Sequence, residues 1–264
     1  MRVMDLPTGL LAYCVVLCVM LGAAMGSFLH CAAWRIARGE SFISGRSRCP
    51  QCGHALTFPD LIPLLSWLFL RGRCRRCGAK IPVRYFLAEL FFAALTVACL
   101  FRFGLTAAFL RAWGFCCCLF LLSMVDAEVR EIPDGCLIAA VVIWLGTLPL
   151  LWNGFADLLL HIAAGVVYGG AILLLSLLLD RLLKKESLGG GDVKLLAVIG
   201  LYLGFLQTLF ALIFACILGL LQSLVTSRRR GDAFPFGPAL SLGAALTLFF
   251  GGALAAWYLG LFRL

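Results

Sequence analysis

The chain has 264 residues, of which 63% are hydrophobic and only 13% are charged, and its mean hydropathy is +1.04. This composition excludes a soluble globular protein, in which the share of charged residues is about twice as large. The formal net charge of +9 is compatible with nucleic-acid binding, but the positive residues are confined to a few short polar stretches between long apolar runs.

The apolar runs predict an all-α, polytopic membrane protein of about eight transmembrane helices. Crossing a ~30 Å hydrocarbon core takes about 20 apolar residues, and runs near this length recur through the chain. The runs are continuously apolar and do not alternate, which excludes a transmembrane barrel. The predicted spans are residues 9–31, 85–101, 108–125, 136–152, 158–179, 193–205, 207–226 and 239–259.

The run from Val193 to Val225 is too long for one span and is predicted to form two helices. Gly200, Gly204 and Gln207 offer a place to turn between them. The first run, Leu10–Phe28, is interpreted as a membrane helix because it is longer than the apolar part of an ordinary signal peptide, and the stronger basic cluster follows it. A cleavable signal peptide is the alternative for this run.

Positive charge sets the predicted orientation of these helices. Ten Lys or Arg residues lie between Arg35 and Arg84, three lie in residues 180–192, and three form Arg228–Arg230. The alternate loops, around residues 103–106 and 153–157, are nearly devoid of positive charge. The positive-inside rule therefore predicts that the basic stretches are cytoplasmic and that both termini lie outside.

A repeated cysteine pair in the polar segment 35–84 predicts a metal site. Two C-x2-C pairs, separated by 21 residues, are formed by Cys49, Cys52, Cys74 and Cys77. Four thiolates can close a tetrahedral shell on a structural zinc ion, and glycines after each pair, Gly53 and Gly78, permit the tight turns. Two disulfides or free thiols are the alternatives, but a reducing cytoplasm disfavours disulfides. His54 is expected to be a bystander, and the other nine cysteines to pack as small apolar residues.

An arginine-rich zinc ribbon is also typical of nucleic-acid-binding proteins, which is the weaker interpretation for this chain. Arg71, Arg73, Arg75 and Arg76 are close in sequence to predicted membrane helices, where their charge would attract anionic lipid or fix the topology. We therefore expect membrane lipid, and no nucleic acid, among the partners of the chain.

Two acidic residues lie at the ends of apolar runs, where ionisable groups are costly and tend to be functional. Asp126 ends the third predicted span, and Asp192, preceded by three glycines, begins the sixth. The predicted topology places both on the cytoplasmic side at similar depth. Two close carboxylates share a proton, so one can act as general base on water while the other polarises a carbonyl. Asp126 and Asp192 are therefore the candidate catalytic residues of a peptide hydrolysis.

Other roles are possible for these acids. Asp192 is placed where a helix N-cap is expected, and Asp134 is predicted to be a cap or turn residue. A proton-coupled transporter would also use membrane carboxylates, although these are expected near the midplane and not at the edge. A membrane-anchored zinc-ribbon binding module is a third possibility, but eight spans are more than an anchor needs.

Motifs spread over most of the chain occur in a characteristic order. They are Gly26-Ser27-Phe28-Leu29, the two cysteine pairs, Asp60 with Ile62-Pro63-Leu64-Leu65-Ser66-Trp67, Arg84-Tyr85, Glu89, Asp126 with Ile132-Pro133-Asp134, Gly189-x-Gly191-Asp192 with Lys194, and Pro235-Phe236-Gly237-Pro238. This ordered set resembles the bacterial prepilin peptidases of the type IV leader peptidase family.

The resemblance implies an aspartyl endopeptidase with Asp126 and Asp192 as its catalytic pair. Such an enzyme cuts the basic leader from type IV prepilins or type II secretion pseudopilins at the cytoplasmic face of the bacterial inner membrane. It also implies N-methylation of the new terminus with S-adenosylmethionine, for which no glycine-rich fingerprint identifies binding residues. We expect a first transmembrane helix (1–34), a cytoplasmic four-cysteine zinc-binding domain (35–84) and a transmembrane protease domain of about seven helices (85–264).

Overall fold

The computed structural model describes residues 6–43, 45–184, 189–225 and 236–261. Every regular element in these ranges is a helix, and the extended stretches form only two isolated bridges, Arg48 with Ala55 and Arg73 with Lys80. The predicted all-α class is therefore confirmed. The chain divides into two compact units, Met1–Phe109 and Leu110–Leu264.

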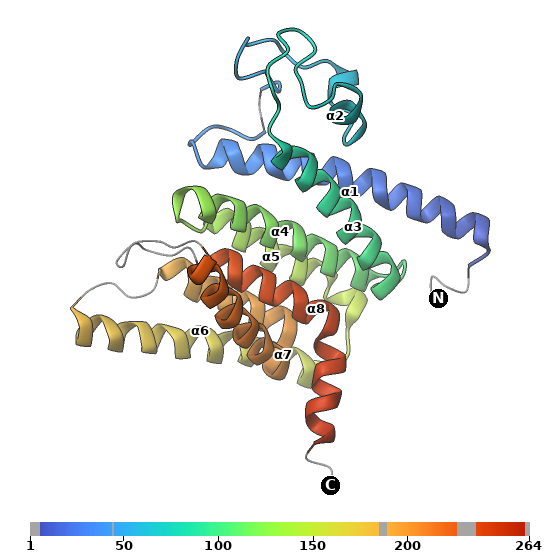
Figure 1. The fold of residues 1–264 in the computed structure, drawn as a ribbon. Helices are drawn as coiled ribbons and strands as arrows, with labels where there is room; N and C mark the ends of the chain where they lie inside the picture. Colours follow the sequence, from blue (N-terminus) through green and yellow to red (C-terminus); the bar gives the residue numbers. More distant parts are fainter. Residues whose placement is uncertain (1–5, 44, 185–188, 226–235, 262–264) are drawn as a thin grey trace. The chain divides into compact units, whose positions relative to one another are not determined.

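The first unit is built on two long helices that pack against each other (Figure 1). Its elements are α1 (Thr8–Ile36), the 3-10 turn η2 (Phe58–Asp60), the short helix α2 (Leu65–Phe69) and α3 (Val83–Phe103). A Cβ atom at Gly26 would lie 2.7 Å from the carbonyl oxygen of Ala88. This glycine therefore allows α1 to touch the backbone of α3.

The second unit is a bundle in which α7 packs against α5, α6 and α8. Its elements are α4 (Ala107–Val129, with its first turn at the boundary), α5 (Asp134–Thr147), the 3-10 turn η3 (Pro149–Leu151), α6 (Phe155–Leu183), α7 (Gly190–Val225) and α8 (Gly237–Gly260). Phe115 of α4 and Tyr202 of α7 stack in the core with ring centroids 3.8 Å apart. The Tyr202 hydroxyl donates a hydrogen bond to the Ala140 carbonyl oxygen at 2.6 Å, which ties α7 to α5.

Six of these helices are long and apolar enough to cross a membrane, and α5 is a shorter apolar helix. The chain is therefore a multi-pass membrane protein. Gly204 interrupts α7 with φ of 71° and ψ of −172°, which are not helical angles. The predicted turn in this run is confirmed. When the two segments of α7 are counted separately, the described residues contain eight apolar helical segments. Lys185 and Arg228–Arg230, on which the predicted orientation partly depends, lie outside the described residues.

Candidate active site and metal centre

Asp126 lies on the buried face of α4, near the C-terminal end of that helix. Leu122 and Leu119, four and seven residues earlier, are buried on the same face. Asp126 continues this face and is only 5% exposed. The buried position of an acid at the end of an apolar helix requires a polar partner.

The partner of Asp126 is the first residue of α8. The backbone N–H of Gly237 donates a hydrogen bond to Oδ2 of Asp126 at 3.1 Å. The first N–H groups of a helix have no partner within the helix, so Gly237 has a donor to spare. A Cβ atom at Gly237 would lie 2.6 Å from the same oxygen. The contact therefore needs glycine at this position.

Asp192 lies at the start of α7 and is half-buried. The helix begins at Gly190, so Asp192 lies inside the first turn and is not the N-cap that the sequence suggested. Leu195, Leu196 and Ile199 follow on the same face and are buried in the core of the second unit. The Asp126 carboxylate is close enough to act on Asp192 electrostatically. The structure thus brings together the two acids that the sequence singled out.

A second acid near α7 forms an ion pair. Lys194 donates a hydrogen bond from Nζ to Oδ1 of Asp134 at 2.7 Å. Of the cap or turn role predicted for Asp134, the cap is wrong, because the N-cap of α5 is Pro133 and Asp134 lies in the first turn of the helix. Both side chains are more than half exposed, and such a pair contributes at most about 1 kcal/mol. The pair links the first residue of α5 to the N-terminal part of α7.

The four predicted metal ligands form one cluster in the first unit. The sulfur atoms of Cys49, Cys52, Cys74 and Cys77 all lie within 4.8 Å of one another. Four sulfurs at ~2.3 Å from a tetrahedral zinc ion are about 3.8 Å apart, and the Sγ atoms of Cys49 and Cys77 are 3.9 Å apart. The donor set and its spacing fit a single tetrahedral metal ion.

The two cysteine pairs adopt the same local geometry. Gly53 donates its N–H to the Cys49 carbonyl oxygen, and Gly78 donates to that of Cys74, both at 2.9 Å. These glycines have φ of 66° and 69°, as the sequence predicted for tight turns. Hydrogen bonds from the backbone N–H groups of Cys77 and Arg76 lower the pKa of the Cys74 thiol to about 7. The thiolate is the form that binds metal.

His54 is not part of the cysteine cluster. Its Nδ1 lies 3.0 Å from Nη1 of Arg76, in the second cysteine pair, which agrees with the bystander role expected for it. In the described part of residues 37–82, only Cys49, Gly72 and Cys74 are buried. The cysteine cluster therefore occupies the place that a hydrophobic core has in a larger domain.

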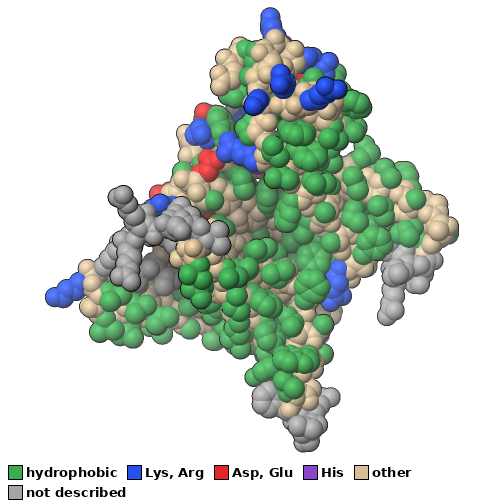
Figure 2. Space-filling view, in the orientation of Figure 1, with side chains coloured by type: hydrophobic (Ala, Val, Ile, Leu, Met, Phe, Trp, Pro, Cys, Tyr) green, Lys and Arg blue, Asp and Glu red, His purple; other side chains and the backbone are tan. Residues whose placement is uncertain are grey.

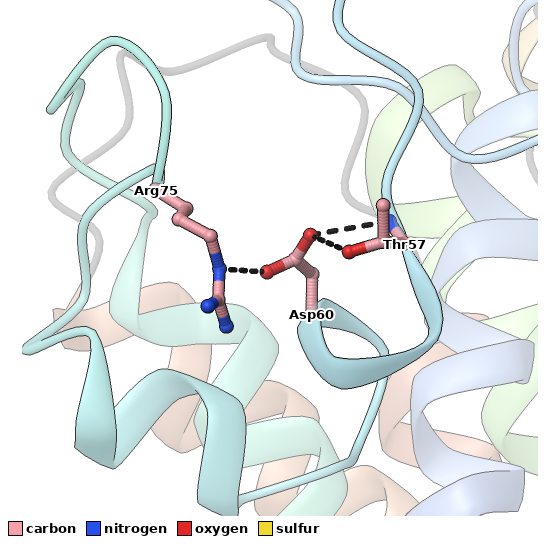
Figure 3. Close-up of polar contacts among 3 residues, drawn as sticks. All are labelled: Thr57, Asp60 and Arg75. Carbon is pink, nitrogen blue, oxygen red and sulfur yellow. Dashed lines mark hydrogen bonds and ion pairs between the residues drawn. The ribbon is translucent and has the colours of Figure 1, made fainter.

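Asp60 connects the second cysteine pair to the turn η2 (Figure 3). Its Oδ1 accepts a hydrogen bond from Nε of Arg75 at 2.7 Å, and its Oδ2 accepts one from the Thr57 hydroxyl at 2.6 Å. The hydrogen bond from Thr57, together with the Arg75 guanidinium, lowers the pKa of the Asp60 carboxyl. Asp60 is therefore charged at neutral pH, and its ion pair with Arg75 links the second cysteine pair to η2.

In the sequence, Glu89 is conspicuous only as part of a family motif. The structure shows its hydrogen-bond partner. Its Oε2 accepts a hydrogen bond from the backbone N–H of Leu64 at 2.7 Å, and the residue is 8% exposed. This bond fastens the segment just before α2 to the second turn of α3. The sequence signal for Glu89 is its position as an acid inside an apolar span. Its partner, Leu64, could not be predicted in this way because it lies 25 residues away in sequence.

Comparisons with known proteins agree with these features. Residues 20–103 match the model of the bacterial peptidase A24 N-terminal domain, and residues 113–224 match the type IV leader peptidase family. Three similar proteins are each named prepilin leader peptidase/N-methyltransferase. That of Burkholderia pseudomallei strain 1026b is 35% identical over 93% of this chain and 87% of its own length.

The other two come from different organisms. The protein of Dichelobacter nodosus is 35% identical over 83% of this chain and 80% of its own length. That of Bacillus subtilis strain 168 is 33% identical over 90% of this chain and 95% of its own length. No solved structure matches the chain. The similarity therefore covers both the cysteine cluster and the pair of acids.

Proposed function

The chain belongs to the type IV leader peptidase family, and from that premise we propose that it removes leader peptides from prepilins or pseudopilins with Asp126 and Asp192. The observation that carries the proposal is the position of these two carboxylates at the ends of membrane-length helices α4 and α7, near enough for Asp126 to act on Asp192 electrostatically. The family membership and the position of the acids disfavour a proton-coupled transporter and a zinc-ribbon binding module.

In the proposed reaction the two carboxylates share one proton. The ionised carboxylate takes a proton from a water molecule, whose oxygen attacks the carbonyl carbon of the leader peptide bond. The protonated carboxyl group donates its proton to the carbonyl oxygen, which gives a neutral tetrahedral intermediate. When the C–N bond breaks, the leaving amine takes a proton from the carboxyl group that received one from water, and a hydroxyl group of the intermediate gives its proton to the other carboxylate, so the pair again holds one proton. The Gly237 N–H holds Oδ2 of Asp126, so Oδ1 would be the oxygen that acts on the water.

We place this reaction at the cytoplasmic face of the bacterial inner membrane. The positive-inside rule supports this side, because residues 35–84 carry ten Lys or Arg residues and lie on the same predicted side as Asp126 and Asp192. The basic leader would be cut off in the cytoplasm, and the apolar helix of the pilin would stay in the bilayer.

We also propose that the chain N-methylates the new terminus, because the similar proteins carry both activities in their names. S-adenosylmethionine would supply the methyl group, which passes from its sulfonium sulfur to the neutral amine as S-adenosylhomocysteine leaves and the amine loses a proton. No motif in this sequence identifies the residues that bind the donor.

The four cysteines are proposed to hold one structural zinc ion. The near-tetrahedral spacing of their sulfur atoms and the two matching knuckle turns support this assignment. All four coordination positions would be filled by protein, so the ion would stabilise the fold of residues 35–84 and would not bind substrate.

Mass spectrometry of a prepilin incubated with the purified protein tests both activities. Without S-adenosylmethionine we expect loss of the leader, and with it we expect the mass of one added methyl group on the new N-terminus. A prepilin that keeps its leader would refute the peptidase. Loss of the leader without methylation would refute the methyltransferase alone, provided that a synthetic pilin with the free terminus is not methylated either.

Gly237→Ala should lower the rate of leader cleavage by roughly 100-fold. The new Cβ would lie only 2.6 Å from Oδ2 of Asp126 and push the carboxylate aside, and a displacement of about 1 Å can have an effect of this size. Gly260→Ala is the matched control, because it lies in the same helix and its Cβ would meet no atom within 4 Å. Equal cleavage rates for both variants would show that the Gly237 contact does not position Asp126.

A further inference from the structure

The segment that follows α2 places free positive charge beside exposed apolar side chains. On α2, Leu65 and Leu68 are about half exposed and Phe69 is 82% exposed. Arg71 and Arg73 follow directly and are also exposed. Figure 2 shows Lys and Arg side chains gathered next to hydrophobic ones on this segment. Such a combination is unfavourable in water and typical of a surface that meets a lipid bilayer.

These residues line a common groove. The groove has a volume of about 620 Å³, and its lining includes Phe69, Leu70 and three arginines at 71, 73 and 75. The Arg75 guanidinium is already paired with Asp60. Within the described ranges, no side-chain hydrogen bond or ion pair involves Arg71 or Arg73. The groove therefore carries about two positive charges that no described acid neutralises.

Contacts with α3 hold α2 beside the N-terminal end of that helix. Trp67 of α2 stacks on Phe86 of α3 with ring centroids 4.9 Å apart. The backbone N–H of Leu64 donates a hydrogen bond to the Glu89 carboxylate. The 21 residues of α3 span about 31 Å, so the whole helix is needed to cross the hydrocarbon core. Phe86 and Glu89 are three and six residues from its start, which places α2 within about 5–9 Å of that end.

At this depth the apolar side chains and the arginines of the surface match the acyl chains and the phosphate of a phospholipid. With α3 as a membrane span, α2 would lie at the edge of the hydrocarbon core, and Arg71 and Arg73, within four residues of Phe69, would be in reach of the lipid phosphates. Arg84, in the first turn of α3, adds a further cation at the same level. Interfacial arginines attract anionic lipids, and guanidinium groups bind phosphate through paired hydrogen bonds.

We propose that the groove at Phe69, Arg71 and Arg73 binds the phosphodiester headgroup of an anionic phospholipid from the surrounding bilayer. Arg71 and Arg73 hold the phosphate oxygens, and Phe69 with Leu68 contacts the adjoining acyl chain. This site is made entirely by residues of the first unit, and its existence does not depend on the proposed protease activity.

Native mass spectrometry of the delipidated, full-length protein tests the site. The protein in detergent is titrated with phosphatidylglycerol or with zwitterionic phosphatidylcholine, and the bound lipids are counted. We expect one phosphatidylglycerol to bind more tightly than the rest, and no equivalent phosphatidylcholine. In the double variant Arg71→Gln/Arg73→Gln this binding should weaken roughly 30-fold, because each arginine near an anionic surface contributes about a factor of five.

Arg46→Gln/Arg48→Gln is the matched control. These arginines belong to the same segment and do not line the groove, yet their loss removes the same charge. If both double variants lose the lipid equally, the attraction is unspecific and the proposal is wrong. It is also wrong if phosphatidylcholine binds as well as phosphatidylglycerol, or if millimolar inorganic phosphate displaces the lipid completely. Unchanged metal content in both variants confirms that the segment is still folded.

Discussion

Asp126→Asn and Asp192→Asn should each lower the rate of leader cleavage by about 10²- to 10⁴-fold, the range of general acid–base catalysis. Asparagine keeps the size of the side chain but can neither take a proton from water nor give one to the substrate. In the Asp126→Asn variant, the amide oxygen of the new side chain could still accept the Gly237 hydrogen bond. Folding should therefore be preserved while the chemistry is lost, and the processed fraction of a prepilin can be followed by mass spectrometry.

Asp157→Asn is a suitable control for this pair. Asp157 is also an acid in the first turn of a membrane-length helix, α6, but its side chain is 45% exposed and pairs loosely with His161 at 3.9 Å. Its substitution should leave cleavage within a few-fold of the unaltered protein. Processing at the normal rate by either Asp126→Asn or Asp192→Asn would remove that residue from the catalytic role, whatever the other variant does.

The local features of this site follow from its sequence. Continuous apolar runs of membrane length predict the helices, and the break at Gly204 is visible because Val193–Val225 exceeds one span. The doubled cysteine spacing predicts the cluster because each knuckle is a local turn with a glycine at positive φ. The two acids are conspicuous because charge is rare in apolar segments.

The features that the sequence does not predict are contacts between distant segments. Gly237 and Asp126 are 111 residues apart, and Lys194 and Asp134 are 60 apart. Nothing local specifies which helix end will supply a donor to Asp126, since every helix start has spare N–H groups. An N-cap at Asp192 is a reasonable expectation because glycine is a poor helix former, yet α7 already begins at Gly190, and Gly191 lies against the side chain of Ile132.

The second large effect concerns the cysteines. Replacing Cys49 or Cys74 with serine should release the bound metal, so that a content of about one zinc per chain falls to near zero. Because the described part of residues 37–82 buries so little else, the segment should then unfold locally. Trypsin would cut it at its exposed arginines, such as Arg73 and Arg76, much faster than in the unaltered protein. Elemental analysis and timed proteolysis measure the two effects.

Cys216→Ser is the control that separates the loss of a metal ligand from the loss of a cysteine elsewhere in the chain. Cys216 is an exposed cysteine of α7, and its replacement should leave zinc content and proteolysis unchanged. If Cys49→Ser loses the metal but residues 35–84 resist trypsin as before, the metal does not hold this segment together, and the Asp60–Arg75 and Leu64–Glu89 bonds must do so instead. If the unaltered protein contains no zinc when purified without chelators, the cluster is a set of free thiols, and the matched knuckle turns serve packing alone.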